Sequence, residues 1–366
     1  MIFRLVWENV GFRPVRTLLS MLLIGVPVTM ILTLVGLSYG FFDDSAKRQA
    51  GVGADILFRP SGSSLMGGSQ AGLSEKFIGA LAAEPHVVAT TGITAHLLGG
   101  GAFDSIVGID QASFVHLSGP FIFVSGHGLE KPDDILLDRY YSDQTKVSTG
   151  GKIKVLNKEW NVVGVVEPGK LAHMFVNIGV LQALVGETGK VSHIYIKLDD
   201  PRNTGQVMDY LAKKYDGYPN YSMKDITSFY SVDNIPILKG FIQAVMGIGV
   251  VIGFIVVLLS MYMAVLQRTR EIGILKSLGS SKGFVMGIIL AEAFLLGCGG
   301  AIVGIALSFA SRSIMNTLMP ASLPMAIVPL WWLYSGVIAI IGALLGALLP
   351  GMMAVRQDPI EALAYE

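Results

Sequence analysis

The sequence has a single cysteine, Cys298, and few charged residues. One cysteine excludes an intrachain disulfide and any zinc or iron–sulfur site built from several cysteines. Charged residues are 15% of the 366, whereas roughly 25% is usual for a soluble domain. The 27 basic and 27 acidic residues cancel, so no net positive charge is available to hold nucleic acid. With 52% apolar residues, this composition favours a chain that lies partly in lipid.

Long stretches of the sequence have few or no charged residues. Residues 17–42 and 240–267 have no charged side chain, and residues 283–311 have only Glu292. Residues 313–355 are also uncharged, and their second half is strongly apolar. A helix needs about 20 residues to cross the roughly 30 Å hydrocarbon layer of a bilayer. We therefore predict four transmembrane helices, at residues 17–42, 241–266, 284–310 and 331–355.

Basic residues near the ends of these helices predict the orientation. Residues 1–16 carry three arginines and residues 267–283 carry four basic residues, whereas residues 311–330 carry only Arg312. Cytosolic loops are enriched in lysine and arginine. We therefore expect both termini and the 267–283 loop in the cytosol, and the 311–330 loop outside. Residues 1–16 have the pattern of an amphipathic elbow helix on the membrane surface, and residues 356–366 form a cytosolic tail.

The long segment 43–240 between the first two helices is expected outside the membrane. It holds all six histidines and is long enough for its own hydrophobic core. Residues 152–156 and 160–166 predict a hairpin, residues 191–198 a half-buried strand, and residues 204–215 a short helix. The predicted fold is an α-helical membrane protein with four transmembrane helices and a large α+β extracytoplasmic domain inserted between helices 1 and 2.

Catalytic signatures are missing from this chain. Three glycines precede a lysine, but Lys152, Lys170 and Lys190 are followed by Ile, Leu and Val. The Ser or Thr that would hold magnesium in a phosphate-binding loop is therefore lacking. The histidines are scattered and show no metal-ligand spacing. We expect no catalytic residue, no bound cofactor and no metal in this chain.

Pairs of glycines recur within the predicted membrane helices at a spacing of four residues. Such pairs let helix backbones approach closely in lipid. We expect them to pack helices of this chain against one another or, at one or two pairs, to form a dimer seam. The pairs are Gly249 with Gly253, Gly300 with Gly304, and Gly342 with Gly346.

Glu292 is the one acid within a predicted membrane span. A charge at that depth is costly unless it is paired. Either the helix enters lipid later, near Ala291, which leaves Glu292 at the interface, or Glu292 faces the other helices and pairs with a cation such as Arg268.

The 267–283 loop has the features of a short docking helix. Ile272, Leu275 and Leu278 fall on one helical stripe, Gly279 is placed to end the helix, and Ser281 to cap the next one. The tail also has the signals of a helix start, because Asp358, Pro359 and Glu361 suit the N-cap, N1 and N3 positions of a helix.

These motifs resemble a known family. The run Arg-Thr-Arg-Glu-Ile-Gly-Ile-Leu-Lys-Ser-Leu-Gly at 268–279, Glu292-Ala293, the glycine-rich third helix, Pro350 and Asp-Pro-Ile-Glu-Ala-Leu at 358–363 are similar to permeases of the MacB/FtsX/LolC type. These are membrane subunits of ABC systems with a MacB-like extracytoplasmic core domain. The resemblance implies a bacterial cytoplasmic (inner) membrane protein and covers nearly the whole chain.

The resemblance also implies partners. It implies a separate ABC ATPase beneath the 268–282 loop, with ATP and Mg²⁺ bound by that subunit, and a second permease, either another copy or a paralogue. It allows a periplasmic adaptor or envelope partner. The residues expected to couple to the ATPase are Arg268, Arg270, Glu271, Ile272, Gly273, Leu275, Lys276, Leu278, Gly279, Asp358, Pro359 and Leu363.

Two functions fit these features. One is a permease that couples ATP hydrolysis by its partner to motion of the outer domain, and so exports or extracts an apolar or amphipathic cargo such as a lipid, lipoprotein, peptide or drug. The alternative is a scaffold that transports nothing and transmits force to regulate an envelope enzyme or other partner protein. A membrane-anchored enzyme is disfavoured because no catalytic motif is present.

Overall fold

The computed structural model describes residues 14–63, 72–98, 105–230 and 236–356, and these residues form two compact units. We call Gly40–Ile235 with Met315–Pro324 the α+β unit, and the remainder the helical unit. Most of the predicted elbow helix, residues 1–13, lies outside the described residues, as do Asp358, Pro359 and Leu363.

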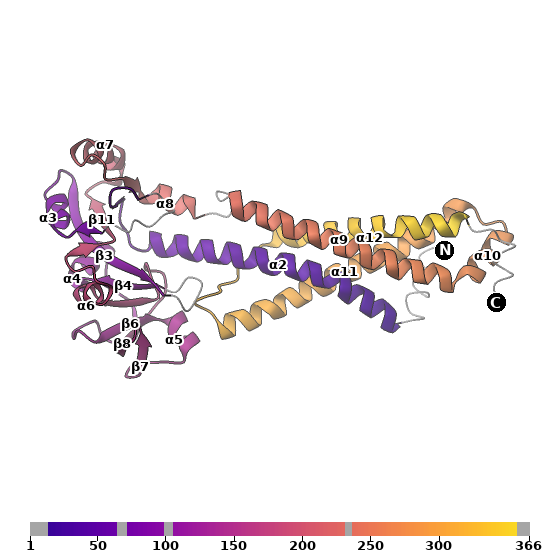
Figure 1. The fold of residues 1–366 in the computed structure, drawn as a ribbon, viewed down its shortest axis with the longest axis horizontal. Coiled ribbons are helices and arrows are strands. Elements are labelled where there is room, and N and C mark those ends of the chain that lie inside the picture. The colour runs from indigo at the N-terminus through magenta and orange to yellow at the C-terminus, as the bar shows by residue number, and fades with distance from the viewer. Residues whose placement is uncertain (1–13, 64–71, 99–104, 231–235, 357–366) are drawn as a thin grey trace. The chain divides into compact units, whose positions relative to one another are not determined.

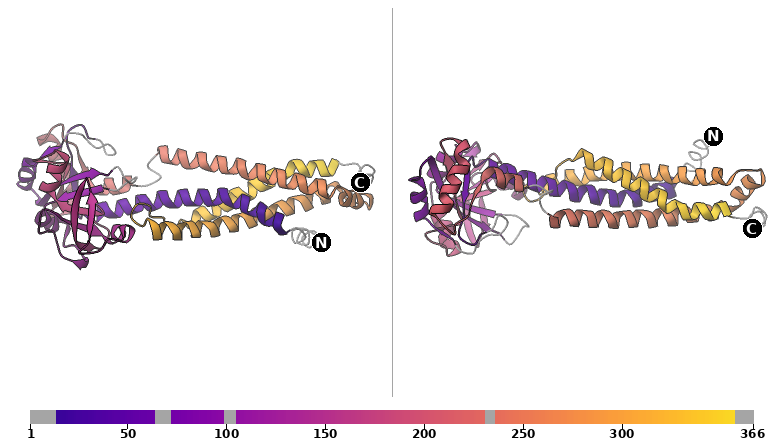
Figure 2. Two further views of the ribbon diagram at one scale, coloured as in Figure 1. Left: turned by 60° about the horizontal axis from the view of Figure 1, so that its bottom comes forward. Right: turned by 90° about the horizontal axis from the view of Figure 1, so that it is seen from above.

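The helical unit contains the predicted membrane helices. Among the described residues, four helices are long and apolar enough to cross a membrane. Each includes one of the four predicted spans, which confirms that part of the fold. The three views in Figures 1 and 2 show these helices running alongside one another. They are α2 (Pro14–Ala50), α9 (Pro236–Gln267), α11 (Lys282–Leu318) and α12 (Pro329–Arg356).

Helix α2 continues beyond the apolar run that predicted it. Its last turns belong to the α+β unit and carry charges that pair along the helix, one turn apart. Asp43 accepts from Lys47 Nζ at 2.6 Å, and Asp44 accepts from Arg48 Nε at 2.6 Å. Pairs at this spacing stabilise a helix in water. The helix therefore ends at Ala50 and not at residue 42, where the apolar run stops.

Glycines bring α2 against α11. A Cβ added at Gly300 would lie 2.5 Å from Ile24 Cγ2, and one at Gly304 would lie 2.6 Å from Val28 Cβ. Thr29 Oγ1 donates to the Gly304 carbonyl at 3.0 Å across the same contact. Backbones can approach this closely only where side chains are absent. This glycine pair therefore packs two helices of the same chain.

The other two glycine pairs differ between their members. A Cβ at Gly346 would lie 2.6 Å from the Phe254 carbonyl oxygen of α9, and one at Gly342 would lie 3.7 Å from the Val250 carbonyl oxygen. Gly249 faces α2, with its added Cβ 3.4 Å from Pro27. Gly253, in contrast, has no described atom within 4 Å of such a Cβ.

We predict opposite effects for two matched substitutions in these helices. Gly346→Ala forces a methyl group against a backbone carbonyl that cannot rotate away, and overpacking of this kind costs about 1–3 kcal/mol. Gly253→Ala meets open space, so it should leave stability unchanged or raise it by up to about 1 kcal/mol through helix propensity. Thermal unfolding of the full chain in detergent measures both. Equal melting temperatures for the two variants would contradict the packing described here.

The α+β unit is built on one large mixed sheet. Among the described residues its ten strands lie in the order β12-β1-β11-β3-β4-β9-β6-β8-β5, with β7 also paired to β8, while β2 and β10 form a separate pair. Two pairings, β4 with β9 and β6 with β8, are parallel, and the others are antiparallel. In chain order the strands are β1 (Ile56–Phe58), β2 (Leu73–Ser74), β3 (Val87–Leu97), β4 (Ser105–Ile109), β5 (Phe123–Gly126), β6 (Asp134–Asp138), β7 (Lys152–Val155), β8 (Lys158–Val166), β9 (Met174–Asn177), β10 (Lys190–Val191), β11 (His193–Leu198) and β12 (Asn220–Ser222).

Both faces of the central strands of this sheet are buried. Leu57, Leu136, Phe175 and Tyr195 lie in one apolar cluster, and the residues on either side of each of them lie in two clusters on the opposite face. Strands buried on both faces show continuous apolar runs rather than alternation. Helices cover the sheet (Figure 1). They are α3 (Lys76–Ala82), α4 (Gln111–Ser118), α5 (Arg139–Thr145), α6 (Ile178–Val185), α7 (Thr204–Lys214) and α8 (Met223–Phe229), with a 3-10 turn η1 (Pro201–Asn203).

The predicted local elements of this unit are present. The predicted helix is α7, and the predicted strand at 191–198 is mostly β11. The predicted hairpin is β7 paired with β8, but its turn is shorter than expected because Val155 pairs directly with Lys158. Leu156 and Asn157 make the turn with φ values of +52° and +59°. Two positive φ values match the right-handed twist of a two-residue hairpin.

Candidate functional site

A short helix, α10 (Thr269–Ser277), connects α9 to α11 in the helical unit. Gly279 ends it at φ +87°, its N–H bonding to the Lys276 carbonyl, and the Ser280 N–H bonding to the Leu275 carbonyl. This pair of bonds is a Schellman cap. Ser281 Oγ then accepts from the Phe284 N–H at 3.2 Å and caps α11. The structure thus confirms the predicted roles of Gly279 and Ser281.

One surface of α10 is exposed and partly apolar. Leu278 is 78% exposed and Ile274 is 43% exposed, one helical turn apart. Arg270 and Glu271 are also exposed, whereas Thr269 and Gly273 are buried. We call Arg270, Glu271, Ile274 and Leu278 the α10 surface.

The predicted apolar stripe does not act as one surface. Ile272 packs on the buried cluster of the helical unit, and Leu275 is half-buried, whereas Leu278 lies just past the helix end and faces outward. The helix ends before Leu278, so the stripe changes direction at its last member. Ile274 is not among the residues predicted from the sequence to couple to the ATPase. Its i, i+4 spacing to the exposed Leu278 is the signal that would have found it.

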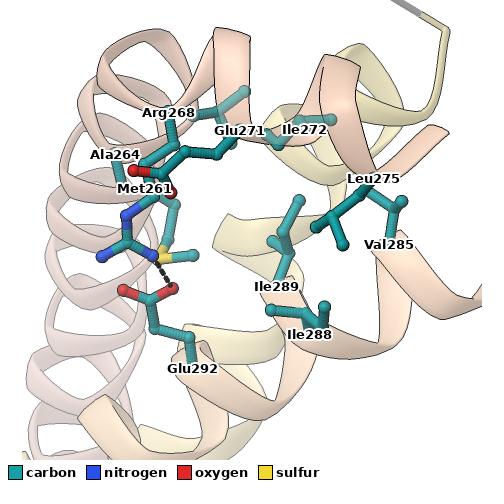
Figure 3. Close-up of a pocket in the computed structure, with 11 residues that line it drawn as sticks. Met261, Ala264, Arg268, Glu271, Ile272, Leu275, Val285, Ile288, Ile289 and Glu292 are labelled. Atoms are coloured by element: carbon teal, nitrogen blue, oxygen red, sulfur yellow. Dashed lines mark hydrogen bonds and ion pairs between the residues drawn. The ribbon is translucent and has the colours of Figure 1, made fainter. Parts of the chain in front are cut away.

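Glu292 is buried and paired. Its side chain in α11 is 5% exposed, and its Oε2 lies 3.1 Å from Nη1 of Arg268, the residue between α9 and α10 (Figure 3). Of the two predicted placements, the structure has the one in which Glu292 faces other helices and meets Arg268. An unpaired carboxylate there would be costly, so the pair holds the end of α9 to α11 directly behind α10.

A pocket of about 130 Å³ lies beside this ion pair. Its walls come from α9, α10 and α11, and Figure 3 shows the ion pair and Glu271 near one side and apolar side chains on the other. Ile272, Leu275, Val285, Ile288 and Ile289 form the apolar wall. The α10 helix therefore rests partly on packed aliphatic groups and partly on a charged contact.

Lys276 connects α10 to a third membrane helix. Its Nζ donates to the Val355 carbonyl in the last turn of α12 at 2.9 Å. A cation at a helix C-terminus satisfies carbonyls that have no partner within the helix. Helix α10 is thus attached to α9 by the chain, to α12 by Lys276 and to α11 by packing and by the chain. These attachments make it part of the helical unit rather than a loose loop.

We predict that the Arg268–Glu292 pair is required for the stability of the helical unit. Glu292→Ala leaves a largely buried guanidinium without this partner, which should cost about 1–3 kcal/mol. Exchange of the two residues in Arg268→Glu/Glu292→Arg should recover part of the loss. Glu271→Gln, an exposed acid beside the same pocket, is the matched control. Melting temperatures of the full-chain variants in detergent measure the effect. A Glu292→Ala variant as stable as Glu271→Gln would show that the ion pair does not stabilise the helical unit.

The described residues hold no cluster of metal-binding side chains. Within 14–63, 72–98, 105–230 and 236–356, no three His, Cys, Asp or Glu side chains are grouped to hold a metal ion. Lys170 Nζ donates to the carbonyls of Ser118, Gly119 and Pro120, and burial lowers the pKa of its amine. This lysine therefore fixes a loop and is not part of a phosphate site.

Two family models match the chain. One, described as the MacB-like periplasmic core domain, covers residues 17–214, which is more than half of the chain. The other, described as the FtsX-like permease C-terminal, covers residues 244–359 and so includes α10 and its capping glycine.

Two relatives and one solved structure each align with just over half of this chain. The uncharacterized ABC transporter permease YknZ of Bacillus subtilis (strain 168) is 30% identical over 206 residues, 54% of this chain and 50% of that protein. The permease MJ1507 of Methanocaldococcus jannaschii is 26% identical, covering 59% of this chain and 54% of its own. The chain thus spans about half the length of these two relatives. The crystal structure of the periplasmic region of MacB from Actinobacillus actinomycetemcomitans aligns with 51% of this chain and 96% of its own, at 14% identity and a TM-score of 0.37.

Proposed function

This chain belongs to the MacB/FtsX type of ABC transporter permeases, and from that premise we propose that it couples ATP hydrolysis by a separate subunit to motion of its α+β unit. The motion exports or extracts an apolar or amphipathic cargo, such as a lipid, lipoprotein, peptide or drug. ATP and Mg²⁺ are bound by the partner, since this sequence has no phosphate-binding loop of its own. A second permease, a copy or a paralogue, completes the complex.

The observation that carries this proposal is the α10 surface. An exposed leucine and isoleucine one turn apart, flanked by Arg270 and Glu271, suit a protein partner better than free solvent. The surface is held by the ion pair behind it and by the Lys276 contact to α12. A partner that displaces α10 therefore displaces helices that cross the membrane.

Exposed apolar residues on the α+β unit favour an apolar cargo. Ile122, Phe123 and Val124 follow one another at the edge strand β5 and are 70%, 39% and 50% exposed. Successive exposed apolar side chains at a sheet edge are unusual unless something covers them.

The second candidate function is a scaffold that transports nothing and regulates an envelope partner. The continuous helix α2 favours it, because such a helix can transmit motion without any path for cargo through the membrane.

We predict that the α10 surface is required to bind the ATPase. Ile274→Asp/Leu278→Asp places two carboxylates in the apolar part of the surface and should reduce co-purification of the ATPase at least tenfold, through desolvation of buried charge. Leu97→Asp, on β3 of the α+β unit and 76% exposed, is the matched control. Undiminished co-purification with the double variant would count against the proposal.

We predict a topology with the α+β unit outside and α10 in the cytosol. In a Cys298→Ala background, a lone cysteine in place of the exposed Ser148 should react with a membrane-impermeant thiol reagent applied to intact cells. A lone cysteine in place of the exposed Ser277 should react only after the membrane is opened. The reverse pattern would overturn the orientation, and with it the cytosolic location of the α10 surface.

A further inference from the structure

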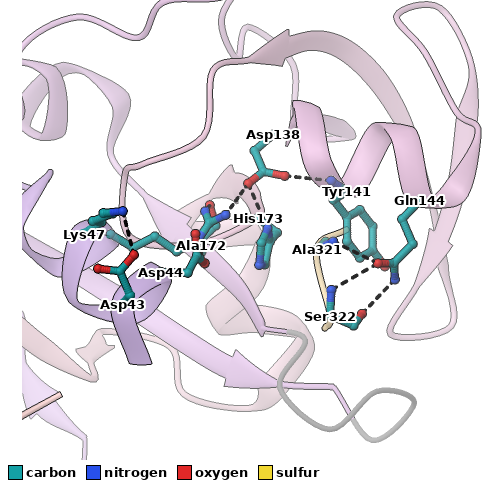
Figure 4. Close-up of polar contacts among 11 residues, drawn as sticks. Asp43, Asp44, Lys47, Asp138, Tyr141, Gln144, Ala172, His173, Ala321 and Ser322 are labelled. Atoms are coloured by element: carbon teal, nitrogen blue, oxygen red, sulfur yellow. Dashed lines mark hydrogen bonds and ion pairs between the residues drawn. The ribbon is translucent and has the colours of Figure 1, made fainter. Parts of the chain in front are cut away.

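Helix α5 in the α+β unit has polar contacts at both ends, buried at its start and part-buried at its far end. At its start, Asp138 Oδ1 accepts from the Tyr141 N–H at 2.8 Å, which is an N-cap. The other oxygen of Asp138 accepts from Arg48 Nη2 at 2.7 Å and lies 2.8 Å from His173 Nδ1 (Figure 4). Arg48 belongs to α2, so this end of α5 holds the extension of the first membrane helix.

The Arg48 side chain is buried and makes three hydrogen bonds. Arg48 is 4% exposed, and its guanidinium also donates to Asp44 and to the Ala172 carbonyl. Burial alone would raise the pKa of Asp138, but the hydrogen bond and charge of His173, followed by the charge of Arg48, keep it below its usual value. The Arg48 carbonyl accepts from the Leu171 N–H at 3.0 Å. The last turn of α2 is therefore fixed to the sheet unit by side chain and backbone.

The far end of α5 holds a second segment. Gln144 Nε2 donates to Ser322 Oγ at 2.7 Å, and its Oε1 accepts from the Ala321 and Ser322 N–H groups at 3.1 Å each (Figure 4). Ala321 and Ser322 lie in the connection between α11 and α12, in the part assigned to the α+β unit. One amide side chain thus satisfies three polar groups of that connection.

Tyr141 lies between the two contacts. Its ring stacks on His173, with centroids 6.3 Å apart, and belongs to the same buried cluster as Ala321. Helix α5 has seven residues, which corresponds to about 10 Å of helix at 1.5 Å each. The end of α2 and the α11–α12 connection are therefore joined over a short distance through one packed helix.

We propose that α5 is a crosspiece that ties the end of α2 to the α11–α12 connection, with Asp138 and Gln144 as positioning residues. When the end of α2 moves, the α11–α12 connection then moves with it, and the reverse also holds. Helices α2, α11 and α12 would therefore act on the α+β unit together. The tie follows from contacts within one unit. Its use in relaying ATP-driven motion rests on the proposed function.

Hydrogen exchange of the full chain in detergent tests the tie without the ATPase. Arg48→Met keeps an apolar stem but removes the guanidinium, and should speed exchange of the Ala321 and Ser322 amides at least tenfold, although Arg48 contacts neither residue in the described contacts. Lys47→Met removes the neighbouring exposed pair with Asp43 and should leave those amides unchanged. In the reciprocal arm, Gln144→Ala should speed exchange of the Leu171 amide, whereas Asp143→Ala, an exposed neighbour, should not.

The outcomes separate a tie from two unrelated contacts. Faster exchange at the remote site in both arms supports the crosspiece. Faster exchange only beside each substitution overturns it. If Arg48→Met fails to fold, Arg48→Lys can replace it, because lysine keeps the charge but lacks the guanidinium's several hydrogen-bond donors. The Gln144→Ala arm gives the reciprocal measurement. Failure of the unsubstituted chain to bind any ABC ATPase would refute the proposed function and leave these exchange rates untouched.

Discussion

Backbone polar groups have no water to bond with in the hydrocarbon core, and the rest of this structure follows from that constraint. Each crossing segment must satisfy its own N–H and C=O groups, so the uncharged runs become helices. Helices in lipid gain little from burying apolar side chains against each other, and backbone approach at small residues takes that role. Gly300, Gly304 and Gly346 provide this approach, and Thr29 adds a hydrogen bond across one contact.

The same constraint limits where charged side chains can lie in the helical unit. Within the predicted spans the one acid is Glu292, and it meets Arg268 where α9 ends. The neighbouring α10 then presents polar and apolar groups at its surface while being held to α9, α11 and α12. A partner bound there would act on the ends of three helices at once.

Polar contacts within the α+β unit hold the end of α2 and the α11–α12 connection. Helix α2 enters this unit as continuous helix, and its last turn is fixed by Arg48 against Asp138. The α11–α12 connection is held by Gln144 on the same short helix α5. The central strands of the sheet beside these contacts are buried on both faces and closely packed.

Much of this architecture was predictable from the sequence, because helix length, lipid solubility and glycine spacing are properties of consecutive residues. The four spans, the inserted α+β unit, the cap at Gly279 and the family resemblance all follow from such local patterns. The outward turn of Leu278, the placement of Glu292 and the use made of each glycine were not determined locally. Arg48 with Asp138, 90 positions apart, and Gln144 with Ser322, 178 apart, meet only in the folded chain. Only tertiary structure decided those pairs. A polar group removed from water must bond to whatever polar group lies next to it in the folded chain, and packing of distant segments determines which group that is.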